Sequence, residues 1–197
     1  MTGPGKLVSK SADGGDSAVL SAERQHPAGP AAERQVHSLI CGRFLKKLAK
    51  TTDKKRRLAI LKACAKVRAA WVEELFWEAL GDACEVVRGF VVKELAGRRT
   101  LDLGQALSRL ERPPWYAKSA VLKLLGVHKA KEAVHEIRKA VEETNNADIR
   151  RSAAEALGEI GGKEALHILV RLKKDPNTYV RQAAEEAIQK ASEVRFV

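Results

Sequence analysis

The stretch ADIRRSAAEALGEIGGKEALHILVRLKKDPNTYVRQAAEEAI, residues 147–188, contains one structural pattern twice. A β-branched residue followed by arginine occurs at Ile149-Arg150 and returns 31 residues later at Val180-Arg181. Small alanines and a Leu-Gly pair follow the first copy, and Gly161-Gly162 then separates it from a second apolar segment. Apolar residues three and four positions apart share one helical face, so this pattern predicts two short helices per copy.

The same pattern extends toward the N-terminus. WYAKSAVLKLLGVHKAKEAVHEI, residues 115–137, aligns without a gap with residues 147–169 at a shift of 32, and Val87-Arg88 aligns with Ile149-Arg150. A basic residue therefore recurs once per repeat, at Arg57, Arg88, Lys118, Arg150 and Arg181. Two helices in every 31–32 residues predict an all-α fold, an α-solenoid of about four to five stacked helical hairpins that bury their apolar faces against one another.

Helix limits follow from apolar spacing and from glycine and proline punctuation. We expect helices over about 33–50, 54–67 and 69–80, one opened by Asp82 and ending near Gly97, one from Pro113-Pro114 to Gly126, and a last one over 177–192. Residues 1–32 hold three of the six prolines and five of the fourteen glycines. Such a composition cannot offset backbone entropy by burial, which predicts a disordered tail over 1–32 and a solenoid over 33–197.

The repeat resembles the HEAT family and, within it, the short phycobilisome-lyase-like HEAT repeats. The resemblance is carried by the Ile-Arg or Val-Arg dipeptide, the alanines, Leu-Gly, the glycine turn and the second apolar helix. It is strongest over 113–191, weaker over 54–112 and absent from 1–32. It implies a structural ladder in which an Asp caps the incoming helix and meets an Arg, here through Asp82, Arg88, Arg150, Asp175 and Arg181. The acid's position holds Thr51, Arg112 and Thr144 in the other repeats, which predicts an interrupted ladder.

Enzymes occur among HEAT-like proteins, and their ligand positions can be compared with this sequence residue by residue. Deoxyhypusine hydroxylases hold two irons with His-Glu pairs, and the resemblance places those pairs at Gly89-Phe90, Ser119-Ala120, Arg151-Ser152 and Gln182-Ala183, none of which is such a ligand set. The sequence has no glycine-rich phosphate loop after a strand and no nucleophile elbow. We therefore expect no catalytic residue, cofactor or metal site; the enzymatic alternative is a bilin-lyase-like or hydroxylase-like enzyme or accessory protein.

The positive charge is concentrated in one segment. The chain carries a formal charge of +11, and residues 33–68 hold twelve basic residues against Glu33 and Asp53. Such a cluster favours polyanions. Three interpretations stay open for this basic N-terminal cap: a solvated end that pairs with the acidic helix Glu73, Glu74 and Glu78, a surface for an acidic protein, or a nucleic-acid site. The candidate binding residues are Lys46, Lys47, Lys50, Lys54, Lys55, Arg56, Arg57 and Trp77.

Trp77 interrupts the apolar face of its helix, because the helical period places it between Glu73 and Glu74. An outward tryptophan is an interface anchor, unless a neighbouring helix covers it. The leading hypothesis is thus a non-catalytic scaffold for protein–protein interaction, with nucleic acid as a weaker alternative partner and no membrane contact. Three widely spaced cysteines, Cys41, Cys64 and Cys84, and the lack of a membrane-length apolar run predict a cytoplasmic protein.

Overall fold

The structure, a computed structural model, describes residues 30–67, 69–112 and 114–193. The chain divides into two units, residues 1–36 and 37–197. Of the first unit only the start of a helix is described; that helix begins at Pro30, and the rest of the predicted tail, residues 1–29, lies outside the described residues. Within the described ranges every regular element is a helix, so the predicted all-α class is confirmed.

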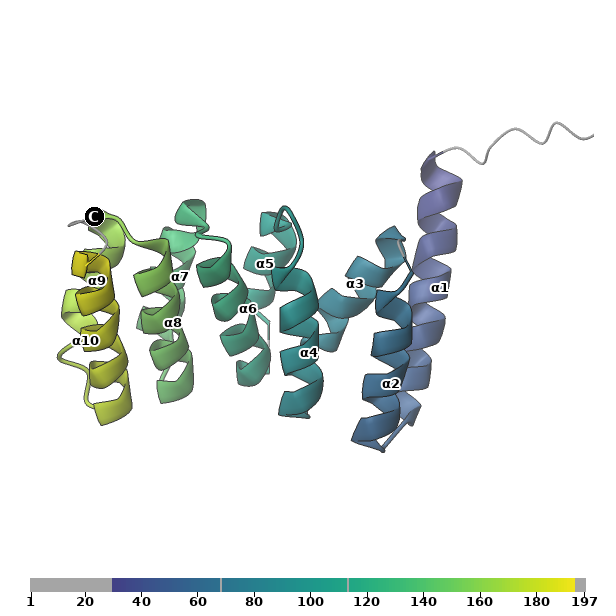
Figure 1. The fold of residues 1–197 in the computed structure, drawn as a ribbon, viewed down its shortest axis with the longest axis horizontal. Helices are drawn as coiled ribbons and strands as arrows, with labels where there is room; N and C mark the ends of the chain where they lie inside the picture. The colour runs from purple at the N-terminus through teal and green to yellow at the C-terminus, as the bar shows by residue number, and fades with distance from the viewer. Residues whose placement is uncertain (1–29, 68, 113, 194–197) are drawn as a thin grey trace, which may run out of the picture. The chain divides into compact units, whose positions relative to one another are not determined.

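The helices are short and follow one another with short connections (Figure 1). Their bounds are α1 Pro30–Lys50, α2 Lys54–Ala65, α3 Ala70–Ala79, α4 Glu85–Ala96, α5 Leu103–Leu110, α6 Trp115–Val127, the 3₁₀ turn η1 Lys131–Ala133, α7 Val134–Glu143, α8 Ala147–Ile160, α9 Lys163–Leu172 and α10 Thr178–Glu193.

Successive hairpins stack, which confirms the predicted solenoid. Helices α2, α4, α6, α8 and α10 form one layer in which each helix contacts the next, and α5, α7 and α9 contact one another in the second layer (Figure 1). The equivalent leucines of α4, α6 and α8, namely Leu95, Leu125 and Leu157, are all buried between the layers. Four helical hairpins, α2–α3 to α8–α9, therefore share one continuous core among the described helices, as expected of a repeat array.

Two sequence-based expectations about helix limits were wrong. Asp82 does not begin α4: the helix starts at Glu85 with Cys84 as its N-cap, and the Asp82 carboxylate accepts a hydrogen bond from the Cys84 N–H at 2.8 Å. Helix α5 was missed altogether. It has only two turns, begins at an Asp102 side-chain cap and is too short to show a full apolar period, so tertiary packing rather than pattern establishes it.

The first-layer helices approach one another closely at glycine and alanine. A Cβ placed on Gly126 of α6 would lie 3.0 Å from the Ala156 Cα, and one on Gly158 of α8 would lie 2.7 Å from the Ala187 Cβ of α10. These distances leave no room for a side chain. Packing therefore explains the Leu-Gly pair of the repeat: without a side chain at glycine, its backbone lies directly against an alanine of the neighbouring first-layer helix.

The N-terminal part of the array is closed by α1, which packs on α3 through aromatic rings. Phe44 stacks on Trp71 with 5.1 Å between ring centroids and 8° between the planes, and Cys41 beside them is 1% exposed. Among the described helices, none combines the length and the apolar character needed to cross a membrane.

Candidate docking surface

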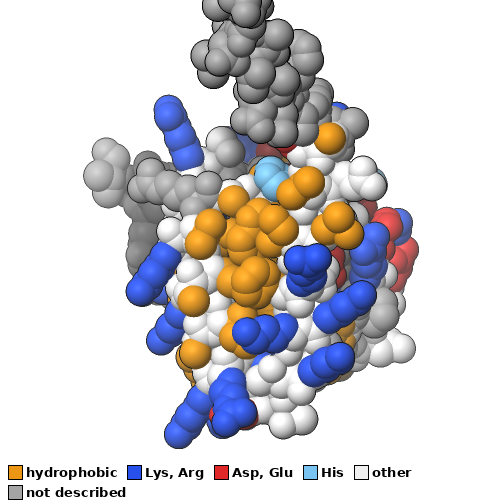
Figure 2. Space-filling view, turned by 90° about the vertical axis from the view of Figure 1, so that its right-hand side faces the viewer, with side chains coloured by type: hydrophobic (Ala, Val, Ile, Leu, Met, Phe, Trp, Pro, Cys, Tyr) orange, Lys and Arg blue, Asp and Glu red, His pale blue; other side chains and the backbone are white. Residues whose placement is uncertain are grey.

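The basic end lies on the last turns of α1 and the first turn of α2. We use this name for six side chains that are all exposed: Lys46, Lys47, Lys50, Lys54, Lys55 and Arg56. Figure 2 faces this side and shows a central stripe of hydrophobic side chains surrounded by lysines and arginines. Leu39 and Val67, on the same two helices or directly after them, are 62% and 45% exposed. Cations and exposed apolar side chains thus occupy the same surface.

A cleft of about 480 Å³ opens between α1 and α2. Ala59 and Ile60 supply its apolar side chains, and the threonines Thr51 and Thr52 line it with Asp53. Three members of the basic end, Lys47, Lys50 and Arg56, complete the lining. The cleft therefore combines an apolar surface with cationic walls, the combination that suits an amphipathic acidic segment better than a bare phosphate backbone.

The lysines of the basic end are not neutralised within the described chain. Arg56 has one weak partner, Asp53, at 3.8 Å, and none of the five lysines forms an ion pair with a described residue. Among the described residues, no lysine of the basic end pairs with the acidic helix, and Glu78 pairs with Arg109. Unneutralised cations on one surface raise its local electrostatic potential and attract acidic partners.

Trp77 does not belong to this surface, which corrects its assignment as an exposed anchor. The side chain is 2% exposed and is covered by α5, where the Arg109 guanidinium lies 5.5 Å from its ring centroid and Nε donates to the Trp77 carbonyl at 3.1 Å. Burial lowers the pKa of Arg109, and Glu78 opposes the shift. The helical period placed Trp77 correctly, away from the apolar face of α3. Its exposure was wrongly predicted, because α5, the helix that covers it, was not recognised in the sequence.

Arg57 also leaves the candidate surface, because its charge is used inside the array. Its Nε and Nη2 donate to the two carboxylate oxygens of Asp82 at 2.7 and 2.9 Å, and both side chains are at most 15% exposed. The hydrogen bond to Asp82 raises the pKa of Arg57. Arg57 is therefore a structural residue, and the docking residues of α2 are reduced to Lys54, Lys55 and Arg56.

The same link recurs at the other end of the array. Arg150 Nε and Nη2 donate to Asp175 at 2.7 and 3.1 Å, and Asp175 also accepts from the Asn177 N–H at 2.8 Å, next to the start of α10. We call each link from the basic residue of one repeat to the acid position of the next a rung. Two rungs, at Arg57 and Arg150, are closed by carboxylates.

The two rungs between them are open, as the interrupted acid positions predict. Arg112 takes the place of the acid opposite Arg88, and Arg88 instead lies 4.5 Å from the ring centroid of Tyr116. Thr144 takes that place opposite Lys118, which has no ion pair with a described residue. Within each repeat, by contrast, Arg88 and Arg181 both donate to the carbonyl six residues earlier, at 2.8 Å. The four arginines of the ladder thus all make this backbone bond, whereas only two rungs have a carboxylate.

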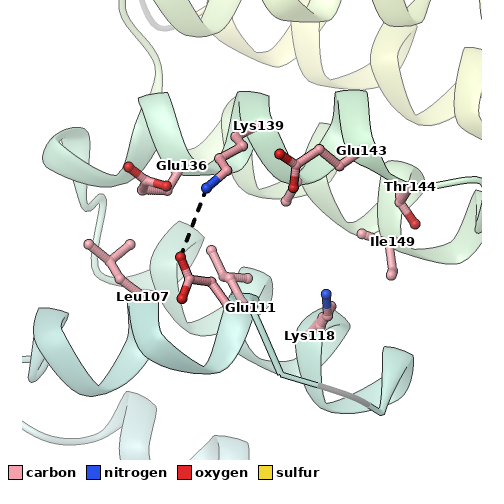
Figure 3. A pocket seen from close by; sticks show the side chains of 10 residues that line it. Leu107, Glu111, Lys118, Glu136, Lys139, Glu143, Thr144 and Ile149 are labelled. Carbon is pink, nitrogen blue, oxygen red and sulfur yellow. Dashed lines mark ion pairs between the residues drawn. The ribbon is translucent and has the colours of Figure 1, made fainter.

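The open rung at Lys118 coincides with a cleft of about 370 Å³ between α5 and α7 (Figure 3). Its lining includes Glu111, Glu136 and Glu143. Lys139, which also lines the cleft, forms an ion pair with Glu111 at 3.9 Å. The equivalent cleft one repeat later contains the closed rung of Arg150 and Asp175 and measures about 220 Å³. The glutamates make the Lys118 cleft unsuited to a further carboxylate.

The closed rung at Asp175 makes a testable contribution to stability against acid. Burial would raise the pKa of Asp175, but hydrogen bonds from Arg150 and from the Asn177 N–H outweigh it and hold the pKa below the ordinary value of 3.8. A carboxyl group whose pKa is lower in the folded state stabilises the fold at pH values above its unfolded-state pKa. This stabilisation disappears as the pH falls through the folded-state pKa. We therefore expect the stability difference between wild type and Asp175→Asn to be full at neutral pH and to shrink as pH falls below 3.8, measured by urea unfolding. A difference that does not change with pH would contradict this assignment.

The three cysteines are core or boundary residues. Cys41 and Cys64 are buried and Cys84 is half-buried. Burial raises the pKa of Cys41 to about 11, with Glu74 and Glu78 adding to the shift, and burial also raises the pKa of Cys64. Their thiols are protonated at neutral pH, so neither is an activated nucleophile.

Part of the repeat array is similar to a known family. A family model of HEAT repeats matches residues 102–189. This segment is similar to HEAT repeats. The match is to HEAT repeats in general, so the phycobilisome-lyase-like subfamily stays a prediction. The matched segment contains α5 to α9 and most of α10, and the closed rung Arg150–Asp175 lies inside it.

A solved structure shares the fold. The structure of human deoxyhypusine hydroxylase in complex with glycerol is similar with a TM-score of 0.52 and 23% sequence identity, over 65% of this chain and 45% of that chain. At this identity the likeness extends to the fold alone, and the chain spans less than half the length of that protein. No curated protein matches the chain.

The residues of this chain do not fit the irons of a hydroxylase-like site. The positions that the resemblance assigns to His-Glu pairs carry Gly89-Phe90, Ser119-Ala120, Arg151-Ser152 and Gln182-Ala183, and Arg151 is engaged in an ion pair with Glu155. Among the residues that the structure describes, no three His, Cys, Asp or Glu side chains lie close enough to hold a metal ion.

Proposed function

We propose that this protein is a HEAT-repeat scaffold that binds an acidic protein partner through its basic end. The observation that carries the proposal is the set of five exposed lysines that have no ion-pair partner among the described residues. Two of them, Lys47 and Lys50, line the cleft that also contains Ala59 and Ile60. An acidic, amphipathic partner segment would bury the apolar side chains and supply the missing negative charges. Charge complementarity of this kind raises the association rate and selects partners.

The apolar stripe distinguishes a protein from a nucleic acid as the partner. Sequence-independent nucleic-acid binding uses aromatic side chains on which bases stack, along a basic groove. Here Phe44 and Trp71 stack on each other, so each ring covers one face of the other, and Trp71 is buried. Exposed Leu39 and Val67 instead offer aliphatic contacts. These features favour a protein surface.

The test is a charge reversal of the basic end in the full-length chain. We expect the variant Lys47→Glu, Lys50→Glu, Lys54→Glu, Lys55→Glu to lose its partner in pull-downs quantified by mass spectrometry, with recovery falling about tenfold or more, because close charge pairs that become repulsive cost at least that factor. All four lysines are exposed, so the melting temperature should stay near the wild-type value.

A matched control separates the basic end from net charge. Lys123→Glu, Lys131→Glu, Lys163→Glu, Lys174→Glu changes the net charge equally at four exposed lysines of other repeats, and it should retain the partner. Equal losses in the two variants would contradict the proposal. Duplex DNA and single-stranded RNA serve as the competing probes: retention by the wild type at about 50 mM salt, with an affinity that falls steeply as salt rises, would replace the protein partner with nucleic acid.

A further inference from the structure

In the closed rungs, the guanidinium N–H groups of each arginine bind two kinds of acceptor, backbone carbonyls and a carboxylate. In both Arg57 and Arg150, Nη1 donates to backbone carbonyls of the arginine's own repeat, at Thr51 and at Thr144 respectively. The opposite edge, formed by Nε and Nη2, holds the carboxylate of the next repeat with two bonds. One edge therefore anchors the guanidinium, and the other presents a preorganised two-donor site for a carboxylate.

Arg88 keeps the anchor and lacks the carboxylate. Its Nη1 donates to the carbonyls of Asp82 and Ala83 at 2.8 and 2.9 Å, as in the closed rungs. Its Nε and Nη2 donate to no group of the described residues, because Arg112 stands where the acid would be. The Tyr116 ring at 4.5 Å holds the guanidinium further without supplying an acceptor to that edge. A fixed arginine with an empty two-donor edge is the arrangement that recognises carboxylates.

The surroundings of Arg88 include an exposed tryptophan. Trp115 is 46% exposed and meets Tyr116 edge to face, with 5.7 Å between ring centroids. Tryptophan, tyrosine and arginine are the residues most enriched at the energetic centres of protein interfaces. Trp115 thus offers a contact surface at the same helix start as the ring that supports Arg88.

We propose that the Nε–Nη2 edge of Arg88 binds a carboxylate side chain of a protein partner, in the manner in which Arg57 binds Asp82 and Arg150 binds Asp175, with an apolar side chain of the partner resting on Trp115. The site lies on α4 and α6, outside the basic end, and its test does not depend on the lysines. The other open rung does not share this property, because Glu111, Glu136 and Glu143 line the cleft at Lys118 and repel a carboxylate (Figure 3).

The test uses the peptide Ac-Leu-Glu-Asp-Leu-NH₂ with the full chain carrying isotope-labelled arginine and tryptophan, observed by NMR. We expect the peptide at millimolar concentration to shift the Nε–H signal of Arg88 and the indole N–H signal of Trp115. The Nε–H signals of Arg57 and Arg150 should stay in place, since their edges are occupied. The amide peptide Ac-Leu-Gln-Asn-Leu-NH₂ should bind about tenfold more weakly, because the charge-assisted bonds are lost.

Two variants complete the test. Arg88→Lys keeps the charge and loses the two-donor edge. The apparent affinity of the acidic peptide, followed through the Trp115 signal, should therefore fall about tenfold, while the Arg57 and Arg150 signals report an intact fold. Trp115→Ala, at an exposed side chain, should weaken the response at Arg88. The basic-end charge reversal should leave both responses unchanged, which separates this site from the proposed function. An unmoved Arg88 signal, an equal response to both peptides, or a response to inorganic phosphate but not to the acidic peptide would overturn the proposal.

Discussion

Asp175→Ala is expected to lower the free energy of unfolding by about 3–5 kcal/mol, because it leaves the Arg150 guanidinium without its partner in a largely buried position. The Arg150 and Asp175 side chains are 13% and 5% exposed, so water replaces little of the lost interaction. The substitution also removes the acceptor for the Asn177 N–H next to the start of α10. Urea unfolding followed by circular dichroism measures the change.

An exposed ion pair of the same region is the control for this prediction. Lys173 and Glu185 lie 3.9 Å apart and are 45% and 61% exposed. Glu185→Ala should change stability by less than about 1 kcal/mol, as is usual for surface pairs. The replacement of both rung partners by apolar residues, Arg150→Met with Asp175→Leu, should recover much of the loss, because no unpaired buried charge remains. A loss for Asp175→Ala no larger than that for Glu185→Ala would contradict the structural role of the rung.

Gly158→Ala is expected to destabilise the fold by about 1–3 kcal/mol, the usual cost of overpacking a close helix contact. The added methyl would lie 2.7 Å from the Ala187 Cβ and 3.0 Å from its Cα, so α8 and α10 must separate. Because the Cα belongs to the backbone, a side-chain rotation cannot relieve the contact. The change in denaturant midpoint, with the slope unchanged, measures the effect.

The same substitution at Gly89 should act in the opposite direction. Gly89 is exposed on α4, and a Cβ there has no neighbour within 4 Å. Gly89→Ala should therefore stabilise the protein by up to about 1 kcal/mol, the difference in helix propensity between the two residues. If both glycines respond alike, helix propensity rather than the α8–α10 contact determines the result at Gly158.

The ladder illustrates what a repeat sequence predicts and where it misleads. The family pattern places Asp175 six residues before Arg181 and assigns both residues to one ladder, without saying which arginine the Asp175 side chain contacts. In the structure Arg181 donates to the Asp175 carbonyl, while the Asp175 side chain binds Arg150 of the preceding repeat. The first bond is local to one repeat, and the second follows from stacking, because a side chain at a helix start lies beside the neighbouring helix as well as beside its own turn. A one-dimensional pattern does not separate these two partners.

The docking residues were predicted to different degrees for a similar reason. Charge counting identified the exposed lysines of α1 and α2, since a long cationic side chain is rarely buried. It also included Arg57, which is buried by its rung, and Trp77, which is covered by α5. Arg88 was assigned only a structural role. Its empty edge is visible only beside the filled edges of Arg57 and Arg150.

The sequence by itself determined the helical repeat, its period of 31–32 residues, the leucines of the core and the concentration of charge before residue 69. These properties are local or periodic, so each copy of the repeat reports them independently. Only the tertiary structure decided which cations remain unneutralised, which arginine meets which aspartate, and that a two-turn helix covers Trp77. Those properties depend on contacts between elements about 25–32 residues apart, where the distance between side chains follows from helix stacking rather than from spacing along the chain.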